Sequence, residues 1–241
     1  MYKHIDLVEW SEMVAKPDWY FDFMPRYKAL VKQGEEEGKD IADEIKEELY
    51  QFFEERLRDG SVALGIVGED WDRERRAIGT IIIHHTKNKP GITWERLSAM
   101  HLVRLYATYY ASPHYSGEAH VKGEPIYSHH FRADGTQVFY AYHWLVRMDG
   151  SCERLLRDEE IGWQAGNWDV NCKSIAICLD NDYNESTPSQ VVLQAIADII
   201  RAHYADVPLD RILGHREVNL KTVCPGEKFL SEWREKILGL L

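Results

Sequence analysis

The sequence lacks any long hydrophobic run: no apolar stretch approaches the roughly 20 residues that span a bilayer, so we expect no membrane span. The first residues, Met1 to Asp6, also lack the basic and apolar regions of a secretory signal peptide. As written, the protein is expected to stay in the cytoplasm, where it is made, unless lysis or a non-classical route releases it.

An excess of positive charge is absent as well. The formal net charge is −11, and residues 1–78 hold 12 Lys and Arg against 20 Asp and Glu. Nucleic-acid binding needs clustered Lys and Arg, so this balance argues against nucleic acid as a partner and against docking on an anionic surface by charge alone. Hydrophobic residues make up 44% of the chain, which is enough for a packed core.

Cysteine is scarce: only Cys152, Cys172, Cys178 and Cys224 occur, and no two form a Cys-x-x-Cys pair. A chain of 241 residues does not need a disulfide framework. We expect reduced, mostly buried thiols. A disulfide bond between Cys172 and Cys178 is the alternative, although the two ends of one short strand rarely have the geometry for it.

Residues 1–76 are predicted to form a separate helical region of open role. From Lys39 to Arg58, apolar residues recur at intervals of three and four, and Gly60 follows as a stop signal. An earlier helix is expected from Met24 to Lys32, joined to the next by residues 34–38. The aromatic cluster of residues 19–23 either packs against the main domain or forms a wall of a substrate cleft.

Residues 77–241 are predicted to form the main domain. Its fold class is α/β: a mixed central β-sheet flanked by helices, with the N-terminal helical region as an addition. Asp149-Gly150 indicates a β-hairpin, because it follows a stretch of alternating residues that is typical of a strand. Strands are expected at residues 79–84, 139–148, 152–156, 174–179 and 211–213, and helices at residues 93–110, 188–204 and 229–240.

Residues 112–137 show no sustained period and are expected to form mostly loop, of a length that often serves as a functional lid. The loop contains His114, His120, His129 and His130. A second metal site there is one interpretation, and surface histidines are the other.

Candidate metal ligands lie at two distant places. His215 follows a short apolar run, Cys224 precedes Pro-Gly, and His84 and His85 end a β-branched run. Neighbouring strand residues point to opposite faces, so only one of that pair should face a metal. Our prediction is His85, which with His215 and Cys224 gives three ligands and an open fourth position, the catalytic arrangement for zinc. The alternative is that these residues are unrelated: a hydrogen-bonded histidine and a small buried thiol.

Several blocks of the sequence resemble, in family order, motifs of the type 2 N-acetylmuramoyl-L-alanine amidases, which include phage amidases and peptidoglycan recognition proteins. The likeness covers roughly residues 77–240. It implies Zn²⁺ held by His85 (the histidine directly before the small polar Thr86), His215 and Cys224. The matching blocks are residues 81–86, 141–150, 163–168 with 173–177, and 214–226.

The resemblance also implies catalytic side chains. Tyr142 matches the family's catalytic tyrosine, and Thr222 stands two before the cysteine, where the second catalytic residue lies. His215 and Cys224 are one residue further apart than usual, so Lys221 competes with Thr222 for this role. Glu217 is a further candidate, either to orient the loop or to act as general base.

Residues 163–168 are expected to contact substrate. Trp163, Asn167 and Trp168 would line a groove for sugar or stem peptide, since aromatic rings stack on apolar ligand faces; core packing is the alternative for Trp163. Many relatives have His where this chain has Gln164. An amide can hydrogen-bond a substrate carbonyl but cannot transfer a proton.

The resemblance implies zinc-dependent hydrolysis of the amide bond between N-acetylmuramic acid and L-alanine. The substrate would be peptidoglycan or soluble muropeptides. The protein would then be a phage-type lysis enzyme released to the cell wall or a cytoplasmic recycling enzyme. Two alternatives stay open: a non-catalytic peptidoglycan-binding module, and a zinc amidohydrolase acting on another amide. Non-catalytic relatives lack the metal thiolate, so Cys224 favours catalysis. The sequence does not indicate an oligomeric state.

Overall fold

The chain folds into two compact units, seen in a computed structural model that describes residues 2–91, 94–112 and 123–241. The first, the helical unit, consists of residues 1–70 and 93–139; the second, the sheet unit, consists of residues 71–92 and 140–241. The predicted division at residue 76 is therefore wrong in one respect. Residues 94–111, assigned from the sequence to the main domain, pack with the N-terminal helices because their apolar face meets the two long helices of residues 20–37 and 39–58.

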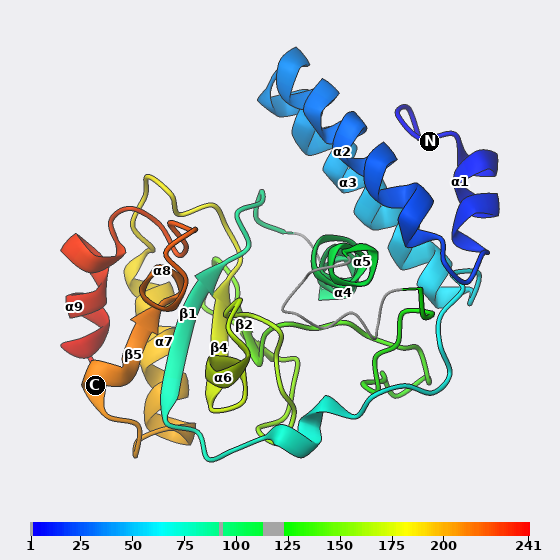
Figure 1. Ribbon diagram of the computed structural model, residues 1–241. Helices are drawn as coiled ribbons and strands as arrows, with labels where there is room; N and C mark the ends of the chain where they lie inside the picture. The colour runs from blue at the N-terminus through cyan, green and yellow to red at the C-terminus, as the bar shows by residue number, and fades with distance from the viewer. Residues whose placement is uncertain (1, 92–93, 113–122) are drawn as a thin grey trace. The chain divides into compact units, whose positions relative to one another are not determined.

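The helical unit contains α1 (Leu7–Val14), α2 (Tyr20–Glu37), α3 (Lys39–Arg58), α4 (Trp94–His101), the π-helical η2 (Leu102–Tyr106) and α5 (Ala107–Ala111) (Figure 1). Helix α3 has the predicted bounds. Helix α2 is longer than expected and includes most of the predicted link, so that only Gly38 separates it from α3. The predicted start of the helix of residues 93–110, at Thr93, lies outside the described residues.

The aromatic cluster of residues 19–23 forms the core of the helical unit. Trp19 and Phe23 are fully buried, and each ring centroid lies 5.2 Å from that of Phe53 on α3. The Trp10 ring of α1 packs edge-on against Phe23 at 5.9 Å. These side chains therefore bring α1, α2 and α3 together.

The described part of the predicted loop, residues 123–137, is irregular apart from a bridge between Phe131 and Gln137. His129 lies 3.5 Å from the carboxylate of Asp70, whereas His130 is buried, so the expectation of surface histidines is wrong for His130. His114 and His120 lie outside the described residues.

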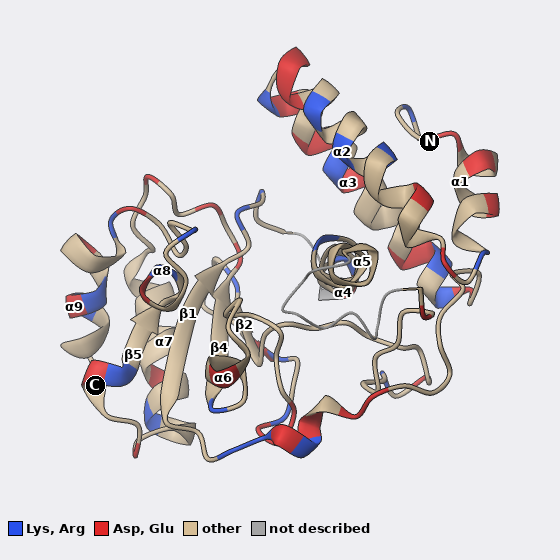
Figure 2. Ribbon diagram, in the orientation of Figure 1, with Lys and Arg blue, Asp and Glu red and all other residues tan. Residues whose placement is uncertain are grey.

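The sheet unit is built on five strands in the order β3-β2-β4-β1-β5. Strands β1 (Thr80–His85), β2 (Trp144–Val146), β4 (Ser174–Leu179) and β5 (Ile212–Gly214) are parallel neighbours, and β3 (Cys152–Arg154) joins β2 through the predicted hairpin. In Figure 2 strands β1, β4 and β5 carry no charged side chain, as expected for strands covered on both faces.

Helices flank this sheet, as predicted. Alternate residues of β1 and β4, among them Ile81, Ile83 and Ile177, share an apolar core with α7 (Gln190–His203), the π-helical η6 (Phe229–Trp233) and α9 (Arg234–Leu238). Parallel strands end at the same edge, so His85, Leu179 and Gly214 bring their following segments together there. The remaining short elements are η1 (Trp71–Glu74), α6 (Trp168–Asn171), η5 (Leu209–Arg211) and α8 (His215–Val218).

None of the four cysteines forms a disulfide bond, so the alternative of a bond between Cys172 and Cys178 is not realised. Cys172 and Cys178 are buried, and Cys152 is exposed. Among the described residues, no helix combines the length and the apolar character needed to cross a membrane.

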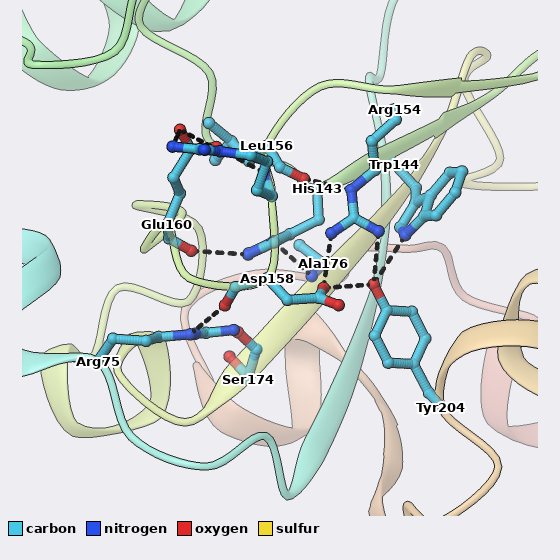
Figure 3. Close-up of polar contacts among 11 residues, drawn as sticks. Arg75, His143, Trp144, Arg154, Leu156, Asp158, Glu160, Ser174, Ala176 and Tyr204 are labelled. Carbon is cyan, nitrogen blue, oxygen red and sulfur yellow. Dashed lines mark hydrogen bonds and ion pairs between the residues drawn. The ribbon is translucent and has the colours of Figure 1, made fainter.

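A buried polar network ties β2 and β3 to the rest of the sheet unit (Figure 3). The fully buried His143 accepts the backbone N–H of Ala176 at Nδ1 (3.1 Å), so its Nε2–H donates to the Glu160 carbonyl (3.0 Å). Nearby, the Tyr204 hydroxyl donates to the Asp158 carboxylate at 2.8 Å. His143 is thus held as the neutral imidazole, and burial, helped by Arg75, lowers its pKa to about 3.

Acid is therefore expected to destabilise the sheet unit through His143. Below pH 6.5 the unfolded chain binds a proton that the folded chain does not, so stability is lost as the pH falls from 6.5 towards 3, by up to ~1.4 kcal/mol per pH unit. Denaturant unfolding at pH 7.5 and 5.0 measures this loss. The His143→Gln variant should show a smaller loss over the same interval, and equal losses in both proteins would contradict the assignment.

Candidate metal centre

Two imidazoles and one thiol meet at the carboxyl edge of the sheet. His84 comes from the end of β1, His215 opens α8 directly after β5, and Cys224 lies in the segment after α8. One ligand atom from each lies within 4.8 Å of the others. The His84 and His215 ring centroids are 4.6 Å apart, and His84 Nδ1 lies 3.7 Å from the Cys224 sulfur. This group differs from the predicted ligands His85, His215 and Cys224 in one histidine.

The exchange concerns the histidine from β1: the structure brings His84, not His85, to the other two. His85 shares the strand face of Ile81 and Ile83, which is packed under α7, and its Nδ1 accepts the backbone N–H of Tyr183 at 2.9 Å. The opposite face carries His84, which is only 1% exposed. The candidate metal group therefore contains His84 in place of the predicted His85.

Close packing around Gly214 places His215 and Cys224 side by side. A Cβ on Gly214 would lie 2.7 Å from the Phe229 ring and 2.8 Å from Pro225, so only glycine fits without displacement. The backbone N–H of Arg216 donates to the Cys224 carbonyl at 2.8 Å, which holds the segment after α8 against the start of that helix.

Glu217 stabilises the same turn. Its carboxylate accepts the backbone N–H of Gly214 at 2.7 Å, as a residue at the third position of a helix does in a capping box. This contact, made by one of the two carboxylate oxygens, is the kind expected of the orienting role predicted for Glu217.

His215 has an unsatisfied nitrogen. Burial lowers its pKa to about 4, against the weaker opposing effect of a hydrogen bond to the backbone of Ala165. Its Nε2 is buried and has no hydrogen-bond partner among the described residues. A neutral imidazole with a buried lone pair is the form in which histidine binds a metal, and the nitrogen–nitrogen–sulfur set suits a borderline-soft divalent ion. The three residues therefore fit a metal ion.

The candidate catalytic side chains lie at different depths. Tyr142 is half-buried just before β2, with its ring centroid 4.9 Å from that of His84. The Thr222 hydroxyl accepts the Cys224 backbone N–H at 3.1 Å. Lys221 is exposed, and its backbone N–H donates to the Asn219 side chain at 3.1 Å. Thr222 is thus held against the backbone of Cys224, whereas the Lys221 side chain lies at the surface.

The predicted substrate-contacting residues separate into two groups. Trp163 and Trp168 are half-buried and form an edge-to-face cluster with Trp71, with ring centroids 5.5 to 6.1 Å apart. Asn167 caps α6, because its side chain accepts the backbone N–H of Val170 at 3.2 Å. In contrast, Gln164 is buried beside His84, to which it lies hydrogen-bonded at 2.6 Å.

Sequence reasoning missed His84 as a ligand and Trp71 as a member of the aromatic cluster. The alternation of side chains along a strand limited the choice to His84 or His85. Because β1 is apolar on both faces, its pattern did not distinguish the two. Trp71 precedes the domain boundary that the sequence suggested, and its short 3₁₀ turn carries no periodic pattern.

These observations define a class: an α/β protein with a mixed sheet and a candidate metal centre at the carboxyl ends of parallel strands. The family model described as N-acetylmuramoyl-L-alanine amidase matches residues 74–227. The chain belongs to this family, and the resemblance seen in the sequence motifs is confirmed.

Solved structures similar to this chain have low sequence identity. One is the N-acetylmuramoyl-L-alanine amidase LysC from Clostridium intestinale URNW, with 18% identity, a TM-score of 0.48, and 72% of this chain and 89% of that chain covered. Another is the AmpD selenomethionine derivative, with 18% identity, a TM-score of 0.45, and coverage of 69% and 86%. Drosophila peptidoglycan recognition protein SD has 17% identity, a TM-score of 0.42, and coverage of 67% and 81%. A search of curated proteins found no match.

Proposed function

We propose that this protein is a zinc-dependent amidase that hydrolyses the bond between N-acetylmuramic acid and L-alanine in peptidoglycan or muropeptides. The observation that carries the proposal is the grouping of His84, His215 and Cys224 within 4.8 Å in a member of this amidase family. Three protein ligands with an open position are typical of catalytic zinc. When bound there, zinc supplies Lewis acidity and a water-derived nucleophile near neutral pH.

The chain's own residues prepare the ligands. Burial lowers the pKa of His215 and so favours its neutral form, and its Nε2 has no hydrogen-bond partner among the described residues. The Nδ1 of His84 faces the Cys224 sulfur, so nitrogen and thiolate can share one ion. We therefore assign the ligands as His84 and His215 through nitrogen and Cys224 through sulfur.

Tyr142 is proposed to stabilise the oxyanion that forms when the amide carbonyl is attacked. Its ring lies beside His84, and it leads into β2, whose pairing with β4 fixes the backbone. A phenol hydroxyl directed at the developing charge lowers the barrier by several kcal/mol in a site that excludes water.

Thr222 is proposed as the second polar group at the scissile bond, because its hydroxyl is anchored next to Cys224 and keeps a hydrogen to donate. Lys221, exposed on the same loop, is proposed to contact substrate at the rim of the site. Glu217 acts through the turn that carries His215 rather than on substrate.

The aromatic cluster of Trp71, Trp163 and Trp168 is proposed to contact the sugar or the stem peptide, with Asn167 beside it. Half-buried indole rings expose apolar edges and faces on which saccharide rings stack. A point mutant of Drosophila peptidoglycan recognition protein LB has been solved with tracheal cytotoxin. Peptidoglycan recognition protein LE has been solved with the same compound, a monomeric diaminopimelic-acid-type peptidoglycan. This is the class of ligand that we propose here.

Digestion of purified peptidoglycan, with and without a chelator, tests the function. We expect mass spectrometry to find stem peptides that begin with free L-alanine, together with glycan strands that have lost them, only in the untreated sample. Elemental analysis should find about one zinc per chain. Cleavage at another amide, or unchanged release in the chelated sample, would refute the proposal.

A further inference from the structure

A short segment, Gln164-Ala165, lies against both histidines of the metal centre. The Gln164 side-chain oxygen lies 2.6 Å from His84 Nε2. The backbone of Ala165 lies close enough to His215 to oppose the lowering of its pKa. The ligands come from β1 and α8, more than 100 positions apart in the chain, so this segment is where their orientations are set together.

Each contact selects a tautomer. At His84, an amide oxygen facing Nε2 requires a hydrogen on that nitrogen, which leaves the lone pair on Nδ1, the nitrogen that faces Cys224 at 3.7 Å. At His215, a hydrogen on Nδ1 would leave the lone pair on the buried Nε2, which has no hydrogen-bond partner among the described residues. Each ring therefore presents one unprotonated nitrogen.

Hydrogen bonds with Asn171 and Ser174 hold the Gln164-Ala165 segment in place. The Asn171 side-chain oxygen accepts the backbone N–H groups of Gln164 at 3.3 Å and Ala165 at 2.9 Å. The Gln164 amide nitrogen donates to the Ser174 hydroxyl at 2.8 Å, which orients the amide with its oxygen towards His84. Gln164, Asn171 and Ser174 are all buried, so these contacts are shielded from water.

We propose that Gln164 is a positioning residue for the metal ligand His84 and not a substrate-binding residue. Its amide is engaged at both ends by protein groups, and it acts through the imidazole rather than on the amide that is cut. A partner of this kind orients the ring, fixes its tautomer and increases metal affinity, and its loss typically costs 10- to 100-fold in affinity. The inference rests on the proposed zinc function, which it deepens.

Zinc affinity of the chelator-stripped full chain, measured by competition with a chromophoric chelator, tests this inference without relying on activity. Gln164→Leu removes the acceptor at similar volume, and we expect zinc to bind about 10- to 100-fold more weakly. Gln164→Glu keeps an oxygen for His84 Nε2–H, and its affinity should stay near that of the wild type. Gln190→Leu, a matched change at an exposed position on α7, should leave zinc affinity unchanged.

The outcomes separate the two proposals. If the wild type binds one zinc tightly and Gln164→Leu does so equally well, the positioning role is wrong and the amidase function stands. If both Gln164 variants lose affinity alike, the acceptor oxygen is not what matters, which also overturns the inference. A wild type that binds no zinc would remove the proposed function together with the inference. Circular dichroism of each metal-free variant shows whether it is folded.

Discussion

Replacement of Cys224 by Ala is expected to abolish tight zinc binding and to lower the rate of amide hydrolysis by roughly 1000-fold or more, because the ion supplies both nucleophile and Lewis acid. The thiolate is the one sulfur ligand of the set, and two histidines alone hold zinc weakly. Zinc content and the release of stem peptides, measured on the same preparation, check the two parts of this expectation.

The matched control is Cys152→Ala. Cys152 lies on β3, is exposed and forms no part of the metal group, so this variant should keep both zinc and activity. Full hydrolytic activity in a Cys224→Ala protein that contains no zinc would show that the reaction does not depend on this centre.

Replacement of Tyr142 by Phe should leave zinc content unchanged and reduce kcat by about 100- to 1000-fold, the usual effect of removing one oxyanion donor. KM should change little, since the hydroxyl is proposed to act on charge that exists only in the transition state. The ring contact with His84, 4.9 Å between centroids, is kept by Phe, so the metal ligand stays supported.

Tyr183→Phe is the control for this second change. Tyr183 is another tyrosine of the sheet unit, more deeply buried than Tyr142, and its hydroxyl contacts Met148 at 3.2 Å. We expect near-normal kcat for Tyr183→Phe. If Tyr142→Phe retains wild-type kcat, the oxyanion role passes to Thr222 or Lys221, and single replacements of these two by Val and Met distinguish them.

The predictions for the fold succeeded where the pattern is local and failed where packing decides. Helix α3 carries a clean periodic pattern and strand β4 is a short apolar run, and both were located to the residue. The glycine- and charge-rich end of α2 was interpreted as a link, yet it is helical because Gly34 packs closely against Ala42 on α3. That contact exists only after the two helices meet.

The candidate site shows the same limit. His215 and Cys224 stand in a short motif whose residue types alone suggested a metal centre. Gln164 was interpreted as a substrate contact because it stands in the family-like block of residues 163–168, but its own side chain turns into the protein towards His84 and Ser174. Side-chain direction in an irregular segment has no period to predict it.

The sequence by itself determined the fold class, the amidase family and two of the three candidate ligands, because these depend on residue types at short, ordered spacings. The tertiary structure alone decided which histidine of β1 joins them. Both faces of that strand are buried, so only the position of α7 on one side, and of Tyr142, Gln164 and α8 on the other, distinguishes His85 from His84.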